Sequence, residues 1–259
     1  MPTDLVRLER RETIATLSLN RPEKRNALNI EMWRGLTDAL DQAARDADLR
    51  CLIVTGAGGH FAAGADMAEF AAQRGTPDAA QAYGEIMLDA LWALRAFPLP
   101  TVARIEGNCL GGGLEIAAMC DLRIAASDAK FGIPIQRVGI TMPYPELSAL
   151  VDLLGRATML EMFLSGDIFD ADWAARRNLV TRTVAPADLD AAVTDLATKI
   201  ASGSPQSHRN HKKFTLRCLE KRPLEAGEIA ESYAAVEGAD YREGIAAFLE
   251  KRRPQFTGT

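Results

Sequence analysis

The sequence predicts an α/β protein with a largely parallel sheet, and three observations support that fold class. Short apolar runs, each the length of one buried strand, alternate with segments whose apolar residues recur at helical spacing. Glycine-rich turns follow two of these runs, as expected where a strand leads into a helix. The last third of the chain shows only helical periodicity. We therefore expect an α/β core followed by a helical C-terminal segment.

Four apolar runs are the expected strands. Residues 13–19 read as a β-run, and residues 51–55, 101–105 and 122–126 are short and almost entirely apolar. Such runs are typical of parallel strands that helices cover on both faces.

Helical spacing predicts the intervening helices. Asn29, a residue type that caps helix N-termini, precedes a segment whose apolar residues recur three or four apart. A second helix covers residues 83–94, and a third opens near Gly112. Beyond residue 189 only helices are expected. We place an α/β core in residues 1–195 and a helical region, the oligomerisation region that the family resemblance given below implies, in residues 196–259.

The composition narrows the class of protein. The 259 residues are 47% hydrophobic and 25% charged, as in ordinary globular proteins. The net charge of -5 offers no basic surface to a nucleic acid, and no apolar stretch approaches the roughly 20 residues of a membrane-spanning helix. The N-terminus lacks the apolar core of a signal peptide, and the four cysteines form no CxxC pair. We expect a cytoplasmic protein that binds neither nucleic acid nor membrane.

Two glycine-rich turns, residues 55–70 and 106–121, each join an expected strand to an expected helix. Neither fits a phosphate-binding fingerprint, because Phe61 stands where the third glycine of GxGxxG belongs and no GK[ST] follows. If the turns converge, one N–H from each can donate to the same oxygen, which is the geometry that stabilises an enolate. The alternative is that the glycines serve only tight turns and close packing.

Glu115 follows the second glycine cluster by two residues, in the first turn of the expected helix. An exposed glutamate there would only complement the helix dipole. Its neighbours are small and apolar, however, and burial among them would raise its pKa toward the range useful for acid/base chemistry. Both interpretations stay open on the residues alone.

Six motifs follow one another along nearly the whole chain. They are LNRPEKRNALN (19–29), FAAGAD (61–66), GNCLGGGLEIAAMCD (107–121), FGIP (131–134), LSGD (164–167) and DYREGIAAFLEKRRPQF (240–256). Together they resemble the crotonase superfamily, the enoyl-CoA hydratase/isomerase family. The resemblance implies a spiral of ββα units whose helical C-terminal region builds a homotrimer or a hexamer of two trimers. It also implies an acyl-CoA thioester substrate, with coenzyme A as part of that substrate and no separate cofactor or metal.

The resemblance also implies site residues. The oxyanion-hole N–H groups fall on Ala65 and Gly112, and Glu115 matches the first of two glutamates with which hydratases of the family position water and move its proton. The loop at Lys24 and Arg25 resembles the segment along the nucleotide end of coenzyme A, and both side chains suit phosphates. The full implied coenzyme A set is Lys24, Arg25, Ala27, Ala63, Asp66 and Met67.

The second hydratase glutamate is absent from its usual place directly after FGxP, where Ile135 stands. An isoleucine cannot move a proton, so three interpretations follow. Glu115 acts alone in hydration or in a double-bond shift; the apolar pocket favours decarboxylation of a malonyl-type thioester; or Glu146 replaces the missing carboxylate. Glu146 also fits an ordinary loop or helix-start charge, and Tyr144 lies two positions from the tyrosine of some decarboxylating relatives.

A non-catalytic coenzyme A thioester binder, with RNA as a secondary ligand, is the alternative class. Ile135 supports it, whereas Glu115 and both glycine turns oppose it, and the acidic charge balance opposes RNA. The sequence therefore favours an enzyme of the enoyl-CoA hydratase/isomerase type that stabilises a thioester enolate with a single glutamate as acid and base. Hydratase or isomerase activity is placed ahead of decarboxylation.

Overall fold

A computed structural model describes residues 4–259. The strands are β1 (Val6–Arg11), β2 (Ile14–Leu19), β3 (Cys51–Gly56), β4 (Thr101–Ile105), β5 (Asn108–Leu110), β6 (Leu122–Ala126), β7 (Lys130–Gly132), β8 (Phe169–Asp170) and β9 (Arg182–Val184). The main sheet has the order β1-β2-β3-β4-β6-β9, and β5, β7 and β8 form a smaller sheet. In the main sheet β1 pairs antiparallel with β2, and the pairs from β2 to β9 are parallel. The mixed α/β class with a largely parallel sheet is confirmed.

The expected strands are found as β2, β3, β4 and β6, whereas β1 and the small sheet were not predicted. Strand β1 (VRLERR) lies at the edge of the sheet and is charged and mostly exposed, so it lacks the apolar signature of a buried strand. The strands of the small sheet are two or three residues long, too short to show a period.

The helices are α1 (Ile30–Ala44), α2 (Met67–Gln73), α3 (Pro77–Arg95), α4 (Gly112–Met119), α5 (Tyr144–Ser165), α6 (Ala171–Arg176), α7 (Leu189–Ala201), α8 (Pro205–Leu219), α9 (Ala226–Tyr233) and α10 (Ala239–Leu249). Asn29 caps α1 as predicted, since its side chain accepts a hydrogen bond from the Met32 N–H at 2.9 Å. No helix in this described part of the chain combines the length and apolar character that crossing a bilayer requires.

Two hydrophobic clusters cover the main sheet. The larger contains α1, α3, α4 and α5, with Trp33, Phe61 and Phe131 among its fully buried side chains. The smaller lies where α7 packs against β3, β4 and β6. Both glycine-rich turns leave the carboxyl ends of neighbouring parallel strands, β3 and β4, which is where open α/β sheets place their ligands.

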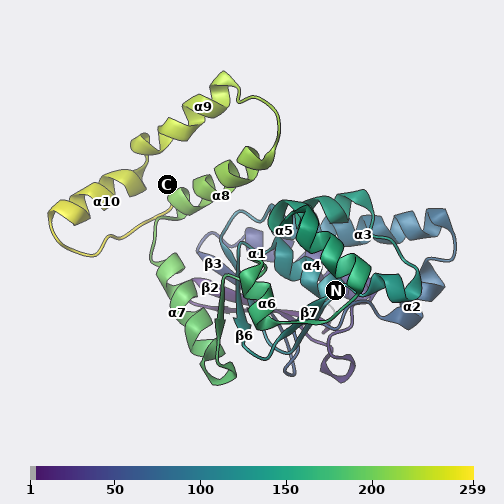
Figure 1. The fold of residues 1–259 in the computed structure, drawn as a ribbon. Helices are drawn as coiled ribbons and strands as arrows, with labels where there is room; N and C mark the ends of the chain where they lie inside the picture. The colour runs from purple at the N-terminus through teal and green to yellow at the C-terminus, as the bar shows by residue number, and fades with distance from the viewer. Residues whose placement is uncertain (1–3) are drawn as a thin grey trace.

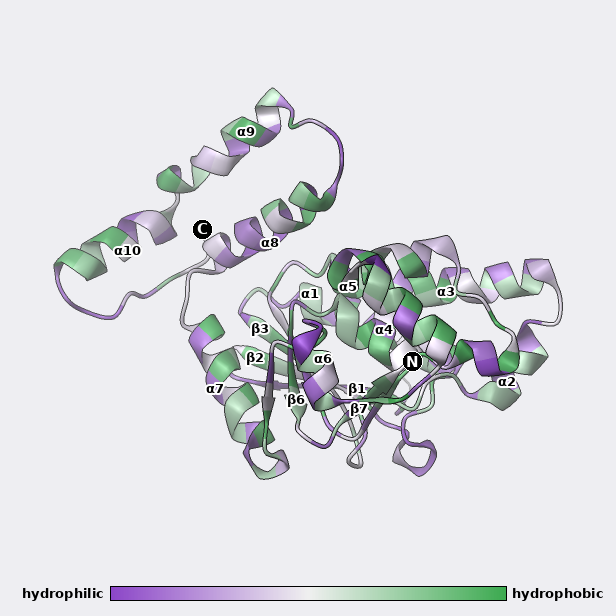
Figure 2. Cartoon of the chain, in the orientation of Figure 1, coloured by the Kyte–Doolittle hydropathy of each residue, from purple (hydrophilic) through white to green (hydrophobic). Residues whose placement is uncertain are grey.

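Helices α8, α9 and α10 form an arm that projects from the rest of the molecule (Figure 1). Hydrophobic residues alternate with hydrophilic ones along α9 and α10 (Figure 2), and several of the hydrophobic side chains are exposed. These are Ile229, Tyr233, Val236, Tyr241, Ile245, Phe248 and Leu249. The boundary set at residue 195 falls within α7, and the division into core and oligomerisation region stays a prediction.

Candidate active site

The two glycine-rich turns meet. Gly64 and Gly111 both have positive φ, at +100° and +50°, and a Cβ on Gly111 would lie 3.5 Å from the Gly64 Cα. The Ala62 N–H donates to the Asn108 carbonyl at 2.9 Å, and the Leu110 N–H donates to the Ala62 carbonyl at 2.9 Å. The convergence on which the expected oxyanion site depends is therefore present.

Ala65 and Gly112 directly follow these two glycines and line a cavity of about 320 Å³, which we call the glutamate cavity. Within residues 4–259 neither N–H donates a hydrogen bond. A Cβ on Gly112 would lie 2.9 Å from Leu28 Cδ1 and 3.0 Å from Trp33 Cζ2, so close packing requires glycine there. Two backbone donors without protein partners beside a cavity are suited to one ligand oxygen.

Two glutamates reach this cavity from different helices. Glu115, in the first turn of α4, is 5% exposed, and Glu146, in the first turn of α5, is 6% exposed. The Glu115 Oε2 atom is buried without a hydrogen-bond partner among the described residues. Most other lining side chains are apolar, including Trp33 and Met87. The surroundings therefore disfavour negative charge on both carboxyl groups.

The pKa values of both glutamates are raised. Burial, and then repulsion from Glu146, raises the pKa of Glu115 to about 8, while the Arg74 charge opposes the shift. Burial raises the pKa of Glu146 to about 7, again against Arg74. Because the two groups titrate together, the pair can hold a proton on one carboxyl group while the other is ionised near neutral pH.

Glu146 and Ile135 line the same cavity. Ile135 lines the cavity as the motif position predicts, and its side chain carries no titratable group. Glu146 is at a helix start, as one interpretation of the sequence held, but it is buried at the cavity and is not an ordinary exposed charge. A sequence signal existed: Ala149, Leu150 and Leu154 follow at helical spacing, and all share its buried face.

Tyr144 does not join the site. Its side chain is 89% exposed and does not line the glutamate cavity, because it lies at the first position of α5, away from the buried face that carries Glu146. The structure therefore gives no support to the tyrosine-assisted decarboxylation that was weighed on the sequence.

The residues expected to bind coenzyme A lie on two neighbouring segments. The Ala63 N–H donates to the Arg25 carbonyl at 2.9 Å, and the Asp66 N–H donates to the Leu28 carbonyl at 2.8 Å. Ala63 and Met67 line the glutamate cavity, whereas Lys24 and Arg25 are exposed in the adjoining loop. Ala27 follows Arg25 by two residues in the same segment, and its carbonyl accepts a hydrogen bond from Arg21 at 3.1 Å. The predicted set is thus contiguous with the cavity.

Two polar side chains hold these segments together. The Asp66 carboxylate lies 2.8 Å from Arg21 Nη1, and this guanidinium lowers the pKa of Asp66. Asn26 is fully buried and donates to the Ala57 and His60 carbonyls at 2.9 and 2.7 Å. These contacts fix the two segments beside each other.

Arg74 also lines the glutamate cavity, and sequence reasoning missed it. It follows the last residue of α2, and its guanidinium carbon lies 4.2 Å from the centroid of the Phe70 ring. A single arginine after a helix is usually solvated, so no local pattern distinguished it.

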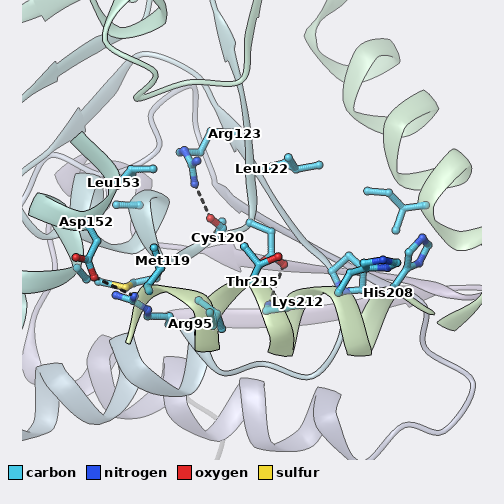
Figure 3. A pocket seen from close by; sticks show the side chains of 18 residues that line it. Arg95, Met119, Cys120, Leu122, Arg123, Asp152, Leu153, His208, Lys212 and Thr215 are labelled. Carbon is cyan, nitrogen blue, oxygen red and sulfur yellow. Dashed lines mark hydrogen bonds and ion pairs between the residues drawn. The ribbon is translucent and has the colours of Figure 1, made fainter. Parts of the chain in front are cut away.

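A second cavity, of about 490 Å³, lies between α8 and the core (Figure 3), and we call it the α8 cavity. Lys212 Nζ donates to Asp121 Oδ2 at 2.8 Å, and Arg123 Nε donates to the Leu179 carbonyl at 2.7 Å. His208 and His211 also line it, but residues 4–259 contain no group of three histidine, cysteine or acidic side chains placed to hold a metal. The Lys212–Asp121 contact docks α8 on the core, whereas the Arg123 contact lies within the core.

Comparison with known proteins identifies the family of this chain. The enoyl-CoA hydratase/isomerase family model matches residues 9–259. An enoyl-CoA hydratase/carnithine racemase structure from Magnetospirillum magneticum is 43% identical, covers 99% of this chain and 97% of its own, and has a TM-score of 0.97. A probable enoyl-CoA hydratase of Mycobacterium tuberculosis is 36% identical over 99% of both chains. The 2,3-dehydroadipyl-CoA hydratase of Escherichia coli is 36% identical over 97% of this chain and 98% of its own. These matches confirm the resemblance seen in the sequence motifs, and this chain belongs to the enoyl-CoA hydratase/isomerase family.

Proposed function

We propose that this protein adds water across the C2–C3 double bond of 2-enoyl-CoA thioesters. The observation that carries the proposal is the buried pair of Glu115 and Glu146 beside the N–H groups of Ala65 and Gly112. The reaction requires charge stabilisation and acid/base chemistry, which backbone N–H groups and glutamates can supply, so no separate cofactor is proposed. Coenzyme A enters as part of the thioester substrate.

The Ala65 and Gly112 N–H groups donate to the thioester carbonyl oxygen. As water adds at C3, negative charge moves onto this oxygen and an enolate forms. Donors that are already in place stabilise that charge without reorganisation, and removal of one such donor typically costs about 10²–10³ in rate. The turns at Gly64 and Gly111 direct these N–H groups into the cavity.

The two glutamates divide the proton transfers. The ionised carboxylate takes a proton from water as its oxygen bonds to C3, and the protonated carboxyl group gives its proton to C2. Raised pKa values keep one glutamate in each form near neutral pH, as this division requires. Glu146 thereby supplies the second carboxylate that Ile135 lacks, and hydration by a single glutamate is no longer needed.

Coenzyme A extends from the cavity along the two paired segments. Lys24 and Arg25 contact its phosphates, since both cations are exposed beside the cavity. The backbone at Ala27, Ala63 and Asp66 lines its path, and Met67 gives it an apolar contact.

A double-bond shift is the second candidate activity. Glu115 Oε2 is buried and has no hydrogen-bond partner among residues 4–259, so this group alone can remove a proton at C2 of a 3-enoyl thioester and return one at C4. Water is not consumed in this reaction, which separates it from hydration.

The arm of α8–α10 is proposed to join copies of the chain into a homotrimer or a hexamer of two trimers. The exposed apolar side chains on α9 and α10 support this assembly, because monomers rarely expose such a set. Sedimentation equilibrium measures the mass directly, and a monomer at micromolar concentration contradicts the proposal.

Incubation with crotonyl-CoA, 3-hexenoyl-CoA and methylmalonyl-CoA tests the activity by mass and by absorbance of the conjugated enoyl thioester. Hydration adds the mass of water to crotonyl-CoA, which is the expected result. A shift of the double bond in 3-hexenoyl-CoA without hydration of crotonyl-CoA favours the isomerase. Loss of carbon dioxide from methylmalonyl-CoA alone, or no reaction with all three, contradicts both.

A further inference from the structure

Arg74 brings a positive charge into the glutamate cavity that no protein carboxylate neutralises. Across residues 4–259, its guanidinium forms no ion pair and donates no hydrogen bond, although it is only partly exposed. It acts on Glu115 and Glu146 only through a longer-range charge effect. A guanidinium has five N–H donors, and partly buried ones are ordinarily paired.

Aromatic side chains hold the Arg74 guanidinium in place. Its carbon lies 4.2 Å from the Phe70 ring centroid and 5.9 Å from that of Tyr83. The two rings support each other edge to face, with centroids 5.7 Å apart and planes at 76°. A guanidinium stacked on a ring keeps its N–H groups free at its edge, where they match the two oxygens of a carboxylate.

The charge of the cavity favours an anionic ligand group. Arg74 and Arg137 line it, and Glu115 and Glu146 together carry one negative charge when they share one proton. The Arg137 guanidinium donates to the Gly166 carbonyl at 2.7 Å, so its donors are partly used. Arg74 is therefore the cation with its donors available, in the same cavity as the reacting groups.

We propose that Arg74 binds a carboxylate at the distal end of the acyl chain, so that the preferred substrates are coenzyme A thioesters of unsaturated dicarboxylic acids. The inference rests on the proposed function, because it places the acyl chain beside Glu115 and Glu146. A neutral acyl chain would leave the guanidinium without a partner in a largely apolar cavity.

Matched substrate pairs test the proposal. Glutaconyl-CoA and 2-pentenoyl-CoA have the same number of acyl carbons and differ in a terminal carboxylate, as do 2-hexenedioyl-CoA and 2-hexenoyl-CoA. The wild type is expected to have the higher kcat/KM for the acidic member of at least one pair. Arg74→Met keeps an unbranched apolar stem over Phe70 and should lower this acidic-to-neutral ratio roughly tenfold or more. Arg74→Lys should retain part of the ratio, because it keeps the charge but loses the planar fork.

Arg137→Met is the control, because it removes one positive charge from the same cavity at a guanidinium that already donates to the Gly166 carbonyl. The ratio should change much less than in Arg74→Met. An equal fall in both variants would show that selectivity comes from the general potential of the cavity and would overturn the assignment to Arg74. A wild-type preference for the neutral member of both pairs would also overturn it.

Failure of the proposed function gives a different result. Hydration of 2-pentenoyl-CoA without preference for the acidic partner removes the inference and leaves the hydratase intact. If no thioester is hydrated, calorimetry with glutaryl-CoA and pentanoyl-CoA measures binding alone. Tighter binding of glutaryl-CoA that Arg74→Met abolishes supports the carboxylate site, and equal affinities in the wild type overturn it.

Discussion

The glutamate cavity and the α8 cavity are both lined by arginines and acidic side chains, but they differ in how those charges are satisfied. In the α8 cavity, Asp121 accepts from the Thr101 N–H at 2.8 Å and from Lys212 at 2.8 Å. In the glutamate cavity, Glu115 Oε2 has no partner within the described part of the chain. A buried polar group that the fold satisfies stabilises the fold, whereas one left unsatisfied costs stability and marks a place for a ligand.

The difference follows from what forms each cavity. Lys212 of α8 pairs with Asp121 of the core, and Arg95, Asp152 and Arg123 find their partners within the core. The glutamate cavity lies beyond the carboxyl ends of β3 and β4, where Gly64 and Gly111 keep side chains away and leave space. The same fold thus holds one set of charges for docking and another for reaction.

The largest expected effect comes from removing the carboxylates of the glutamate cavity. Glu115→Gln and Glu146→Gln should each lower the rate of crotonyl-CoA hydration by about 10²–10⁴, because each loses a proton-transfer group. Both variants should still fold, since glutamine has nearly the same shape without the buried charge. Steady-state kinetics measure the rate, and calorimetry with butyryl-CoA measures retained binding.

Asp152→Asn in the α8 cavity is the matched control for these variants. Its carboxylate pairs with Arg95 at 3.4 Å and does not line the glutamate cavity, so the change removes a charge outside that cavity. Hydration should stay close to the wild-type rate. A loss of hydration as large as that of Glu115→Gln would contradict the distinction between the two cavities.

The next effect comes from a methyl group at the meeting point of the turns. Gly112→Ala places its Cβ against Leu28 and Trp33, both fully buried, so the start of α4 must shift and carry its N–H with it. Hydration should fall about 10²-fold, as for loss of one oxyanion donor. Gly84→Ala in α3 meets nothing within 4 Å and should instead raise the free energy of unfolding by up to about 1 kcal/mol. Equal kinetic losses in both variants would reject the steric argument.

The pH dependence of hydration tests whether the glutamates share a proton. Below about pH 7 both carboxyl groups become protonated and the base is lost, whereas above about pH 8 both are ionised and the acid is lost. The pH profile of kcat/KM should therefore be bell-shaped, falling about tenfold per pH unit on either side. A profile flat from pH 5 to about pH 9 would remove the pair from the mechanism.

The same two glutamates make the free energy of unfolding depend on pH. A carboxylate paired with a cation stabilises the fold when it is ionised, whereas these two stabilise it when they are protonated. Both pKa values are raised above the ordinary 4.5, so the folded state binds protons more tightly than the unfolded state. Their contribution to the free energy of unfolding is complete below about pH 4.5 and is lost as the pH rises through about 7 to 8. Urea unfolding across this range should show a wild-type decrease that the double variant Glu115→Gln/Glu146→Gln lacks.

The part of the site that the sequence predicts is local. The glycines before Ala65 and Gly112 permit unusual backbone angles, and Glu115 lies within the same turn, so neighbouring residues suffice to place them. Asn29 caps its helix for the same reason. Strands β3 and β4 also follow from their own composition, and their parallel order brings the two turns together.

The part that the sequence leaves open for Glu146, and misses for Arg74, depends on contacts between distant segments. Glu146 is 31 positions after Glu115, as the numbering gives, and it reaches the cavity only because α5 packs on α4. The position of Arg74 depends on the Phe70 and Tyr83 rings from α2 and α3. The helical spacing in α5 puts Glu146 on the buried face, but no pattern within one element shows which cavity that face meets or which rings Arg74 contacts.

The smallest expected effect tests the α8 cavity as a purely structural region, through two neighbouring lysines. The Lys212 side chain is 9% exposed and pairs with Asp121, whereas the Lys213 side chain is 61% exposed and pairs with Glu231. Lys212→Met should lower the free energy of unfolding by about 1–3 kcal/mol, since it leaves a partly buried carboxylate short of one donor. Lys213→Met should lower it by less than about 1 kcal/mol, as for other exposed pairs.

Urea denaturation measures both changes, and hydration per folded molecule provides the second measurement. Because Lys212 lies in the α8 cavity and its charge is satisfied there, its loss should reduce stability without a matching loss of hydration rate. A Lys212→Met protein that keeps wild-type stability and loses hydration would show that the α8 cavity acts on the reaction. The two cavities would then form one functional unit. Whether a charged side chain has a protein partner would no longer separate the residues that stabilise the fold from those that act in the reaction.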